Sequence, residues 1–174
     1  INPLLADAGA LEGLAGHRHV ARWVASGIEA TLPLFGSTGE SAIALRAPSA
    51  GEDMAADYAS LGLSPASHPM ALIRASLSAN GFATLAEAGR AAHRRRLRVV
   101  GMIGMRQSPP AAGGVTFVTL EDETAWLNVV VWPDVAEQCR LVLRSSGAVV
   151  VDGRMEHVDG VTHLIAAVVR PVRL

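Results

Sequence analysis

The length and composition of the chain favour one or two folded domains and exclude several classes of protein. It has 174 residues, 50% of them hydrophobic, and a mean hydropathy of +0.31. A chain of this size can bury a core, so wholesale disorder is not expected. No apolar run approaches the roughly 20 residues that span a bilayer. The single Cys139 excludes an internal disulfide framework and a four-thiolate zinc site, and it fits a reducing cytoplasm.

The formal net charge of −1 hides an asymmetry between the two halves of the chain. Residues 1–89 carry four arginines and eight carboxylates, whereas residues 90–174 carry eleven arginines and eight carboxylates. A polyanionic partner is therefore expected to meet the second half, although a charge of +3 is also ordinary for a small domain. The first residue is Ile1 and no signal-peptide pattern follows it, so we expect a piece of a longer protein.

The first 51 residues are expected to form two short helices and a linker. In residues 3–26 apolar side chains recur at helical spacing. Gly16 lies between the two apolar runs, where its freedom to adopt a positive φ suits a tight turn. Residues 30–51 lose the spacing and collect Pro, Gly, Ser and Thr, a composition typical of a linker. We interpret 1–29 as a helical region and 30–51 as the linker.

Helical spacing returns in residues 52–82. We expect them to pack, within a helical segment over 52–96, against the domain that follows. Gly62 is expected to end the first helix, and Ser67 to cap the second, with Pro69 in its first turn. The second helix has a predicted buried stripe of Met70, Ile73 and Leu77.

From Leu97 the apolar period changes to two, which predicts strands. Five strand-like runs cover residues 97–106, 115–121, 126–132, 147–156 and 161–169. A helical pattern over 133–145 separates the third run from the fourth, and Asp159-Gly160 predicts a hairpin turn between the last two. This is the chain order of an OB-fold barrel. The expected fold class is α+β, with N-terminal helices and a linker followed by a five-stranded OB-fold β-barrel over 97–174.

No part of the sequence indicates catalysis. The densest carboxylate cluster is residues 121–123, and paired carboxylates can hold Mg²⁺, but all three fall on one strand-to-turn segment, which favours a solvated turn. His68 is interpreted as a capping or packed histidine, because no second titratable group lies near it. The histidines show no metal-ligand spacing, and no phosphate loop or nucleophile motif is present. We expect no catalytic residue, metal site or cofactor in this chain.

The second and third strands predict a surface suited to nucleic acid. Two-residue alternation turns Phe117 and Thr119 outward on the second strand, and Asn128 and Trp132 outward on the third. Exposed aromatic and amide groups at such positions form base-stacking platforms in OB-folds. In the alternative interpretation, the preceding helices cover Phe117 and Trp132.

Arginines near this surface are candidates for phosphate contacts. Arg106 lies at the end of the first strand, and Arg154 lies on the fourth. The only basic run, residues 94–96 with Arg98, leads into the barrel. It is either a solvated face or the edge of a nucleic-acid groove.

Three sequence blocks, in the same order as here, resemble parts of one family. Residues 114–124 (GVTFVTLEDET) and 127–133 (LNVVVWP) resemble an OB domain. Residues 57–69 (DYASLGLSPASHP) are similar to the segment that precedes that domain, and 8–18 resembles the end of a helix-hairpin-helix region. The family is that of the bacterial C-family DNA polymerases, and the error-prone, DnaE-like (ImuC-type) branch is the most similar.

This resemblance implies a noncatalytic C-terminal module of a cytoplasmic, error-prone polymerase. The parent is implied to be a DNA-directed DNA polymerase, a nucleotidyltransferase using Mg²⁺, that acts in translesion synthesis, DNA repair and SOS mutagenesis. Implied partners are single-stranded DNA, an inactive Y-family-like protein and a RecA-like protein. The Gly-rich hairpin of the family is missing, so DNA binding by residues 1–26 is not expected. An anticodon-type RNA-binding OB domain and a protein-interaction module stay open as alternatives.

A short linker segment predicts a further partner. Leu32, Leu34 and Phe35 resemble the peptide by which bacterial polymerases dock on the sliding clamp, with Thr31 where Gln usually stands. Pro33 between them fixes part of the backbone and so lowers the ordering cost of binding.

Overall fold

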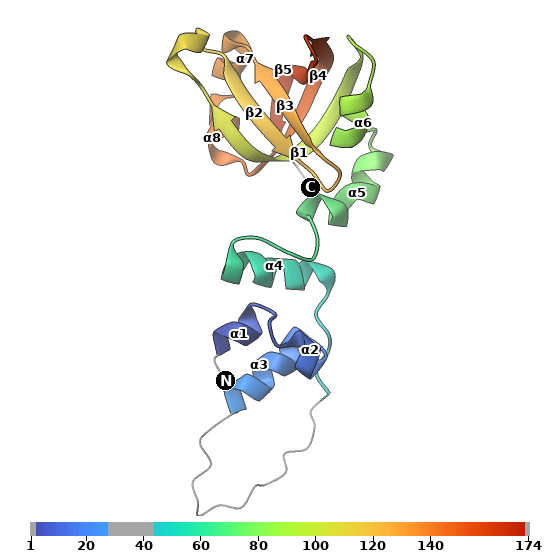
Figure 1. Cartoon of the computed structure of the whole chain (residues 1–174), viewed down its shortest axis with the longest axis vertical. Coiled ribbons are helices and arrows are strands. Elements are labelled where there is room, and N and C mark those ends of the chain that lie inside the picture. The colour runs from blue at the N-terminus through green and yellow to red at the C-terminus, as the bar shows by residue number, and fades with distance from the viewer. Residues whose placement is uncertain (1–2, 28–43, 173–174) are drawn as a thin grey trace, which may run out of the picture. The chain divides into compact units, whose positions relative to one another are not determined.

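The computed structural model describes residues 3–27 and 44–172 (Figure 1). The chain divides into two compact units between Ser67 and His68. The helical segment expected over 52–96 is therefore divided, because its first helix belongs to the first unit and its other helices belong to the second.

In its described residues, the first unit consists of short helices. They are α1 (Pro3–Asp7), α2 (Glu12–Ala15), α3 (Arg18–Gly27) and α4 (Ala50–Leu61). Gly16 ends α2 with a φ of 86°, and Gly62 ends α4 with a φ of 74°, as the sequence predicts. These two glycines adopt backbone conformations that other residues reach only with strain.

The core of the first unit is built from alanines beside a buried ion pair. One buried cluster consists of Ala6, Ala21 and Ala25, and Met54 of α4 is a further buried apolar residue of this unit. Arg18 Nη2 lies 2.5 Å from Asp57 Oδ1, and Ser64 Oγ donates a 2.8 Å hydrogen bond to the other carboxylate oxygen. Burial by itself raises the pKa of the Asp57 carboxyl, but the hydrogen bonds from Arg18 and Ser64 and the Arg18 charge outweigh it and lower that pKa.

The helix α4 begins two residues earlier than the sequence spacing predicts. Ser49 Oγ accepts a hydrogen bond from the backbone N–H of Glu52, and the Glu52 carboxylate accepts one from the backbone N–H of Ser49. This reciprocal capping box satisfies two N–H groups that the helix leaves unpaired. The candidate clamp-binding segment 32–35 lies outside the described residues.

The second unit begins with helices α5 (Pro69–Ala79) and α6 (Leu85–Arg90), which lie beside β1 (Figure 1). The prediction that Ser67 caps α5 is wrong, because the cap must directly precede the first helical residue, here Pro69. His68 takes that place, and its Nδ1 accepts a 3.1 Å hydrogen bond from the N–H of Met70. The capping interpretation of His68 is thus confirmed.

Five strands then form a closed barrel in the order β1-β2-β3-β5-β4. They are β1 (Arg96–Gln107), β2 (Thr116–Glu121), β3 (Trp126–Val131), β4 (Ala148–Val158) and β5 (Val161–Pro171), each within two residues of its predicted bounds. Only the β3–β5 pair is parallel. The helical run between β3 and β4 forms α7 (Pro133–Gln138) and α8 (Arg140–Ser145), and a short 3₁₀ turn (Pro110–Ala112) lies between β1 and β2. This topology confirms the predicted OB-fold.

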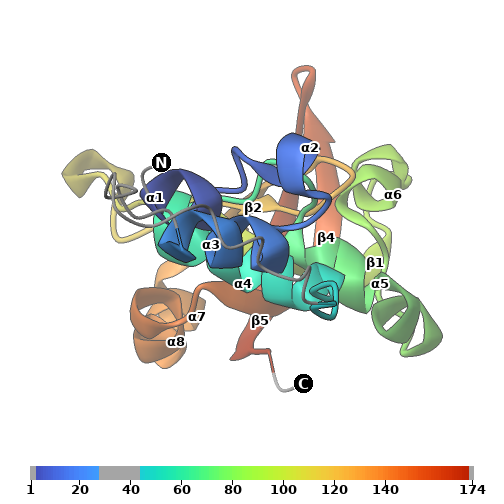
Figure 2. The same cartoon turned by 90° about the horizontal axis from the view of Figure 1, so that it is seen from below.

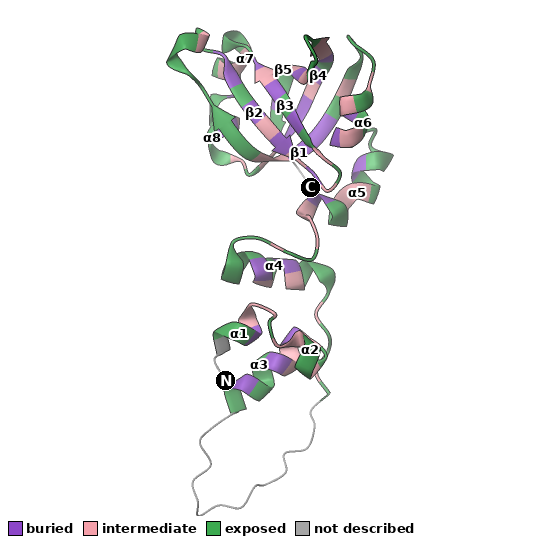
Figure 3. Cartoon of the chain, in the orientation of Figure 1, coloured by how far each residue is buried: buried purple, intermediate pink, exposed green. Residues whose placement is uncertain are grey.

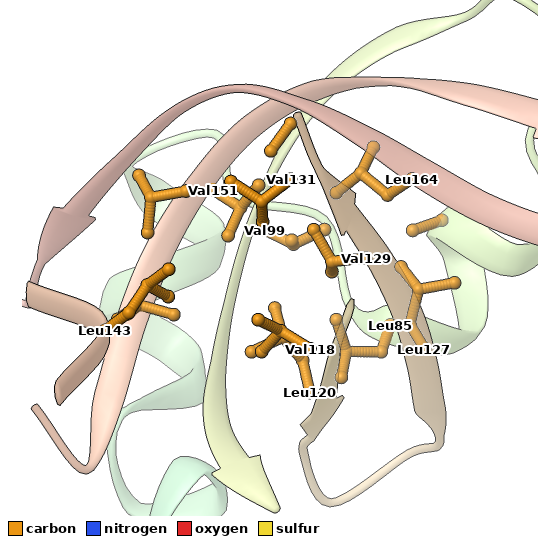
Figure 4. Close-up of a cluster of buried hydrophobic side chains, with 14 of the residues drawn as sticks. Leu85, Val99, Val118, Leu120, Leu127, Val129, Val131, Leu143, Val151 and Leu164 are labelled. Carbon is orange, nitrogen blue, oxygen red and sulfur yellow. The ribbon is translucent and has the colours of Figure 1, made fainter. Parts of the chain in front are cut away.

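The barrel interior is filled by alternate residues of the strands (Figure 4). On β2 and β3 the buried apolar positions are Val118, Leu120, Leu127, Val129 and Val131. Figure 3 shows the resulting alternation of buried and less buried positions along these strands. Cys139 and Leu143 close the interior from the helical side, and burial raises the pKa of the Cys139 thiol. The predicted inward and outward faces of β2 and β3 are therefore confirmed.

One part of the outer surface is covered by a helix. Met70 and Leu77 of α5 pack against Val100 of β1 and Val150 of β4. Because these two valines point away from the interior, their burial depends on α5 rather than on the barrel itself.

The acidic segment 121–123 is not a solvated turn, so that interpretation is wrong. Asp122 is only 4% exposed, and its carboxylate accepts hydrogen bonds from the backbone N–H groups of Leu85, Thr124 and Ala125. Arg74 of α5 pairs with both Asp122, at 2.9 Å, and Glu123. Arg74 lies 48 residues from Asp122 in sequence, a separation beyond the reach of any local pattern.

Candidate nucleic-acid interface

The outer face of β2 and β3 carries a row of paired polar and aromatic positions. Phe117 lies opposite Val130, and Thr119 lies opposite Asn128. Thr119 Oγ1 donates a 3.1 Å hydrogen bond to the Asn128 side-chain oxygen, which leaves the amide nitrogen of Asn128 available for a ligand. Asn128 is exposed and Thr119 is partly exposed.

The aromatic side chains on this face are open to solvent. Phe117 is 42% exposed and belongs to none of the buried hydrophobic clusters. The helix that packs on the barrel surface, α5, contacts Val100 and Val150 instead. Phe117 and Trp132 are therefore not covered by helices within this unit.

Trp126 belongs to the same face and was not selected from the sequence. It lies opposite Glu121 at the start of β3 and is 73% exposed. The two-residue alternation that selects Asn128 would also have selected Trp126. Trp132, by contrast, follows the end of β3 and caps α7, where it is 51% exposed.

Arg106 is separated from the other candidate residues. A β-bulge between Ile103 and Met105 shifts the register, so that Arg106 pairs with the inward-facing Val118. Its guanidinium donates a hydrogen bond to the backbone carbonyl of Leu143 in α8. The extra residue of the bulge reverses the alternation, and Met105 takes the outward place beside Thr119 instead.

Arg154 lies on the outer surface, in register with the β2–β3 face. It pairs with Ile165 of β5, which is followed across the sheet by Val130 and Phe117. Its guanidinium forms an ion pair with Glu156 at 2.7 Å. The structure thus brings Phe117, Thr119, Asn128 and Arg154 onto one continuous outer surface.

The carboxylates do not form a metal site. No group of three or more His, Cys, Asp or Glu side chains suited to a metal ion occurs in the described part of the chain. The carboxylates of Asp122 and Glu123 are engaged by Arg74, so they do not fit Mg²⁺. Among the residues described, no helix is both long and apolar enough to cross a bilayer.

The fold of the second unit defines the class of domain to which it belongs. Residues 97–172 match a family model described as "OB-fold nucleic acid binding domain". The second unit, with its closed five-stranded barrel, is therefore an OB-fold domain, and it resembles the nucleic-acid-binding domains that this family model describes.

Comparison with sequence relatives identifies the family more narrowly than the domain class does. The chain is 48% identical over 166 residues to the error-prone DNA polymerase of Pseudomonas paraeruginosa. This alignment covers 94% of this chain and 16% of the polymerase. It is 46% identical over 163 residues to the error-prone DNA polymerase of Xanthomonas oryzae pv. oryzae, covering 93% and 15% respectively. The chain thus spans about 16% of the length of the curated relatives it matches. It is homologous to the C-terminal portion of error-prone DNA polymerases, which confirms the resemblance found in the sequence.

Solved structures with similar barrels are more distant. Asparaginyl-tRNA synthetase from Pyrococcus horikoshii aligns with a TM-score of 0.46 at 16% identity, covering 53% of this chain and 22% of its own. A small single-stranded DNA binding protein from Mycoplasma pneumoniae aligns with a TM-score of 0.39 at 11% identity, covering 43% of this chain and 90% of its own.

Proposed function

We propose that this chain is a noncatalytic module of an error-prone, translesion DNA polymerase and that its barrel binds single-stranded template DNA. The observation that carries this proposal is the β2–β3 face, where Phe117 and Trp126 are exposed and belong to none of the buried hydrophobic clusters. Base-on-aromatic stacking contributes about 1–3 kcal/mol per base and tolerates any sequence, as copying of varied templates requires.

The geometry of the face suits successive unpaired bases. Trp126 is in register with Glu121, four residues along β2 from Phe117, so the two rings are anchored about 13 Å apart along the strand direction. Thr119 and Asn128 lie between them. We infer two stacking positions flanking a polar centre, where the Asn128 amide donates to a base edge.

The remaining functions belong to the longer polypeptide. We propose that it is a DNA-directed DNA polymerase, with Mg²⁺ held by residues outside this chain. An inactive Y-family-like protein and a RecA-like protein are the proposed partners, with the sliding clamp bound through Leu32, Leu34 and Phe35. The proposed compartment is the bacterial cytoplasm.

The test is a fluorescence titration of the 174-residue chain with labelled single-stranded DNA, single-stranded RNA and duplex DNA. We expect the single-stranded DNA to bind most tightly. Phe117→Ala should weaken that binding by one to two decades, as expected from a loss of about 1–3 kcal/mol. Its melting temperature should change little, because Phe117 is not part of the core.

The matched control is Tyr58→Ala, which removes an exposed aromatic ring from α4 of the first unit. It should leave the DNA affinity unchanged. Tighter binding of RNA would favour the anticodon-type alternative. Absence of binding to any nucleic acid would favour a protein-interaction module, and an equal loss of stability in Phe117→Ala would show that Phe117 supports the fold.

A further inference from the structure

A cluster of arginines lies where the chain enters the barrel. Arg94, Arg95 and Arg96 are exposed, and they form no ion pair within the described residues. Arg154 of β4 lies directly opposite Arg96. We call these four residues the arginine corner.

The backbone of the arginine corner is held in place by hydrogen bonds to β4. The N–H of Arg94 donates to the Met155 carbonyl at 2.8 Å, and the N–H of Met155 donates to the Arg95 carbonyl at 2.9 Å. His157 adds two contacts: its ring Nε2 lies 2.8 Å from the Ala91 carbonyl oxygen, and its backbone N–H donates to His93 Nδ1 at 3.1 Å. The arginines therefore project from a defined surface rather than from a loose tail.

The pairing of Arg96 with Arg154 is unfavourable in the free protein. Like charges directly opposite each other on neighbouring strands repel. Glu156 pairs with Arg154 and reduces this repulsion, whereas no carboxylate of the described residues pairs with Arg96. The next arginine on β1 differs, because Arg98 pairs with Asp152 at 3.0 Å. An anion bound at Arg96 would relieve the repulsion.

The register connects this corner with the stacking face. From Arg154 the pairing runs to Ile165 on β5, to Val130 on β3 and to Phe117 on β2. Three steps of about 4.8 Å between neighbouring strands separate Arg154 from Phe117 by about 14 Å along the sheet. Arg96, Arg154 and Ile165 also line one surface hollow. The β4–β5 hairpin extends past the rest of the barrel (Figure 2).

We propose that the arginine corner binds the phosphodiester backbone of the single strand whose bases stack on Phe117 and Trp126. The strand then crosses β3, β5 and β4 toward the start of β1. It does not leave at the other end of β1, where Arg106 is held by the Leu143 carbonyl. This inference rests on the proposed function and adds the path of the strand.

The experiment compares two double variants of the 174-residue chain that remove equal charge. Arg95→Gln/Arg96→Gln alters the corner, whereas Arg140→Gln/Arg144→Gln alters exposed arginines of α8 near Arg106. The affinity for an oligothymidylate of about 15 nucleotides, near the upper site size of one OB-fold, is measured at four salt concentrations. The slope of log K against log salt is negative, and each lost phosphate contact reduces its magnitude by about 0.7 for a single strand.

We expect the corner variant to reduce the magnitude of the slope by about 1.4, the α8 variant to leave it unchanged, and Phe117→Ala to weaken binding without changing the slope. Equal melting temperatures show that both variants fold, and the single Arg95→Gln should give half of the slope change. An unchanged slope in the corner variants, or an equal loss in the α8 variant, overturns this path while leaving the proposed function intact. Absence of any binding by the unmutated chain overturns both.

Discussion

Two parts of the same barrel surface differ in what lies over them. On β1 and β4, the outward-facing Val100 and Val150 are buried beneath α5. On β2 and β3, the outward-facing Phe117 and Trp126 have no such cover. Both parts place apolar side chains outward, so the strand pattern alone does not distinguish them.

The difference teaches which outward apolar side chains the fold buries and which it leaves exposed. The covering helix is fixed by Arg74, which pairs with Asp122 and Glu123 at the β2–β3 turn. Asp122 also holds the first N–H of α6. Burial under α5 stabilises the fold, whereas the exposed parts of Phe117 and Trp126 bring no such gain. An exposed apolar patch of this kind is where the proposed stacking of bases would occur.

Removal of the Asp122 carboxylate should have the largest effect on the covered part. Asp122→Ala leaves three backbone N–H groups without their acceptor and leaves Arg74 with Glu123 as its remaining carboxylate partner. We expect the free energy of unfolding to fall by about 4 kcal/mol. Urea denaturation measures this loss. Glu121→Ala, at the neighbouring and more exposed position, should stay within about 0.5 kcal/mol of the unmutated chain. Equal effects of the two substitutions would contradict a structural role for Asp122.

Truncation of the helix that covers β1 and β4 should have the next largest effect. Leu77→Ala opens a cavity above Val100 and Val150, and we expect a loss of about 3 kcal/mol in the free energy of unfolding. Leu72→Ala, on an exposed position of the same helix, should cost far less. Neither substitution should change affinity for single-stranded DNA. A clear loss of affinity in Leu77→Ala would show that the covered and open parts are coupled.

Acid should produce the smallest of the three effects, because a protonated carboxyl keeps its shape and part of its hydrogen bonding. Burial by itself raises the pKa of Asp122, but hydrogen bonds from Thr124, Leu85 and Ala125 outweigh it and lower that pKa. The unfolded chain therefore binds the proton first, near pH 4, and stability falls as the pH decreases further. The free energy of unfolding, measured by urea denaturation between pH 6 and pH 3 (roughly the range of carboxyl titration), should decrease less with falling pH in Asp122→Asn than in the unmutated chain. An equal decrease of the free energy of unfolding in both proteins would contradict a contribution of the Asp122 carboxylate to this pH dependence.

The sequence by itself determined the five strands, their order along the chain, which is typical of an OB-fold barrel, and the two faces of β2 and β3. These features depend on local rules: a two-residue alternation places Val118 inward and Phe117 outward, and Asp159-Gly160 adopts the positive φ values of a tight hairpin turn. The sequence blocks also resembled a polymerase family, and the comparison with relatives confirmed that resemblance. The same alternation also predicts Trp126 on the open face.

Only the tertiary structure decided which outward side chains are covered and where the arginines lie. Arg106 turned to the other face because a β-bulge adds one residue to β1, and the sequence pattern carries no sign of that residue. Asp122 became buried because Arg74 reaches it from 48 residues away. Arg96 met Arg154 because two strands far apart in sequence are neighbours in the closed barrel. Each outcome depends on contacts between distant residues, which local periodicity does not specify.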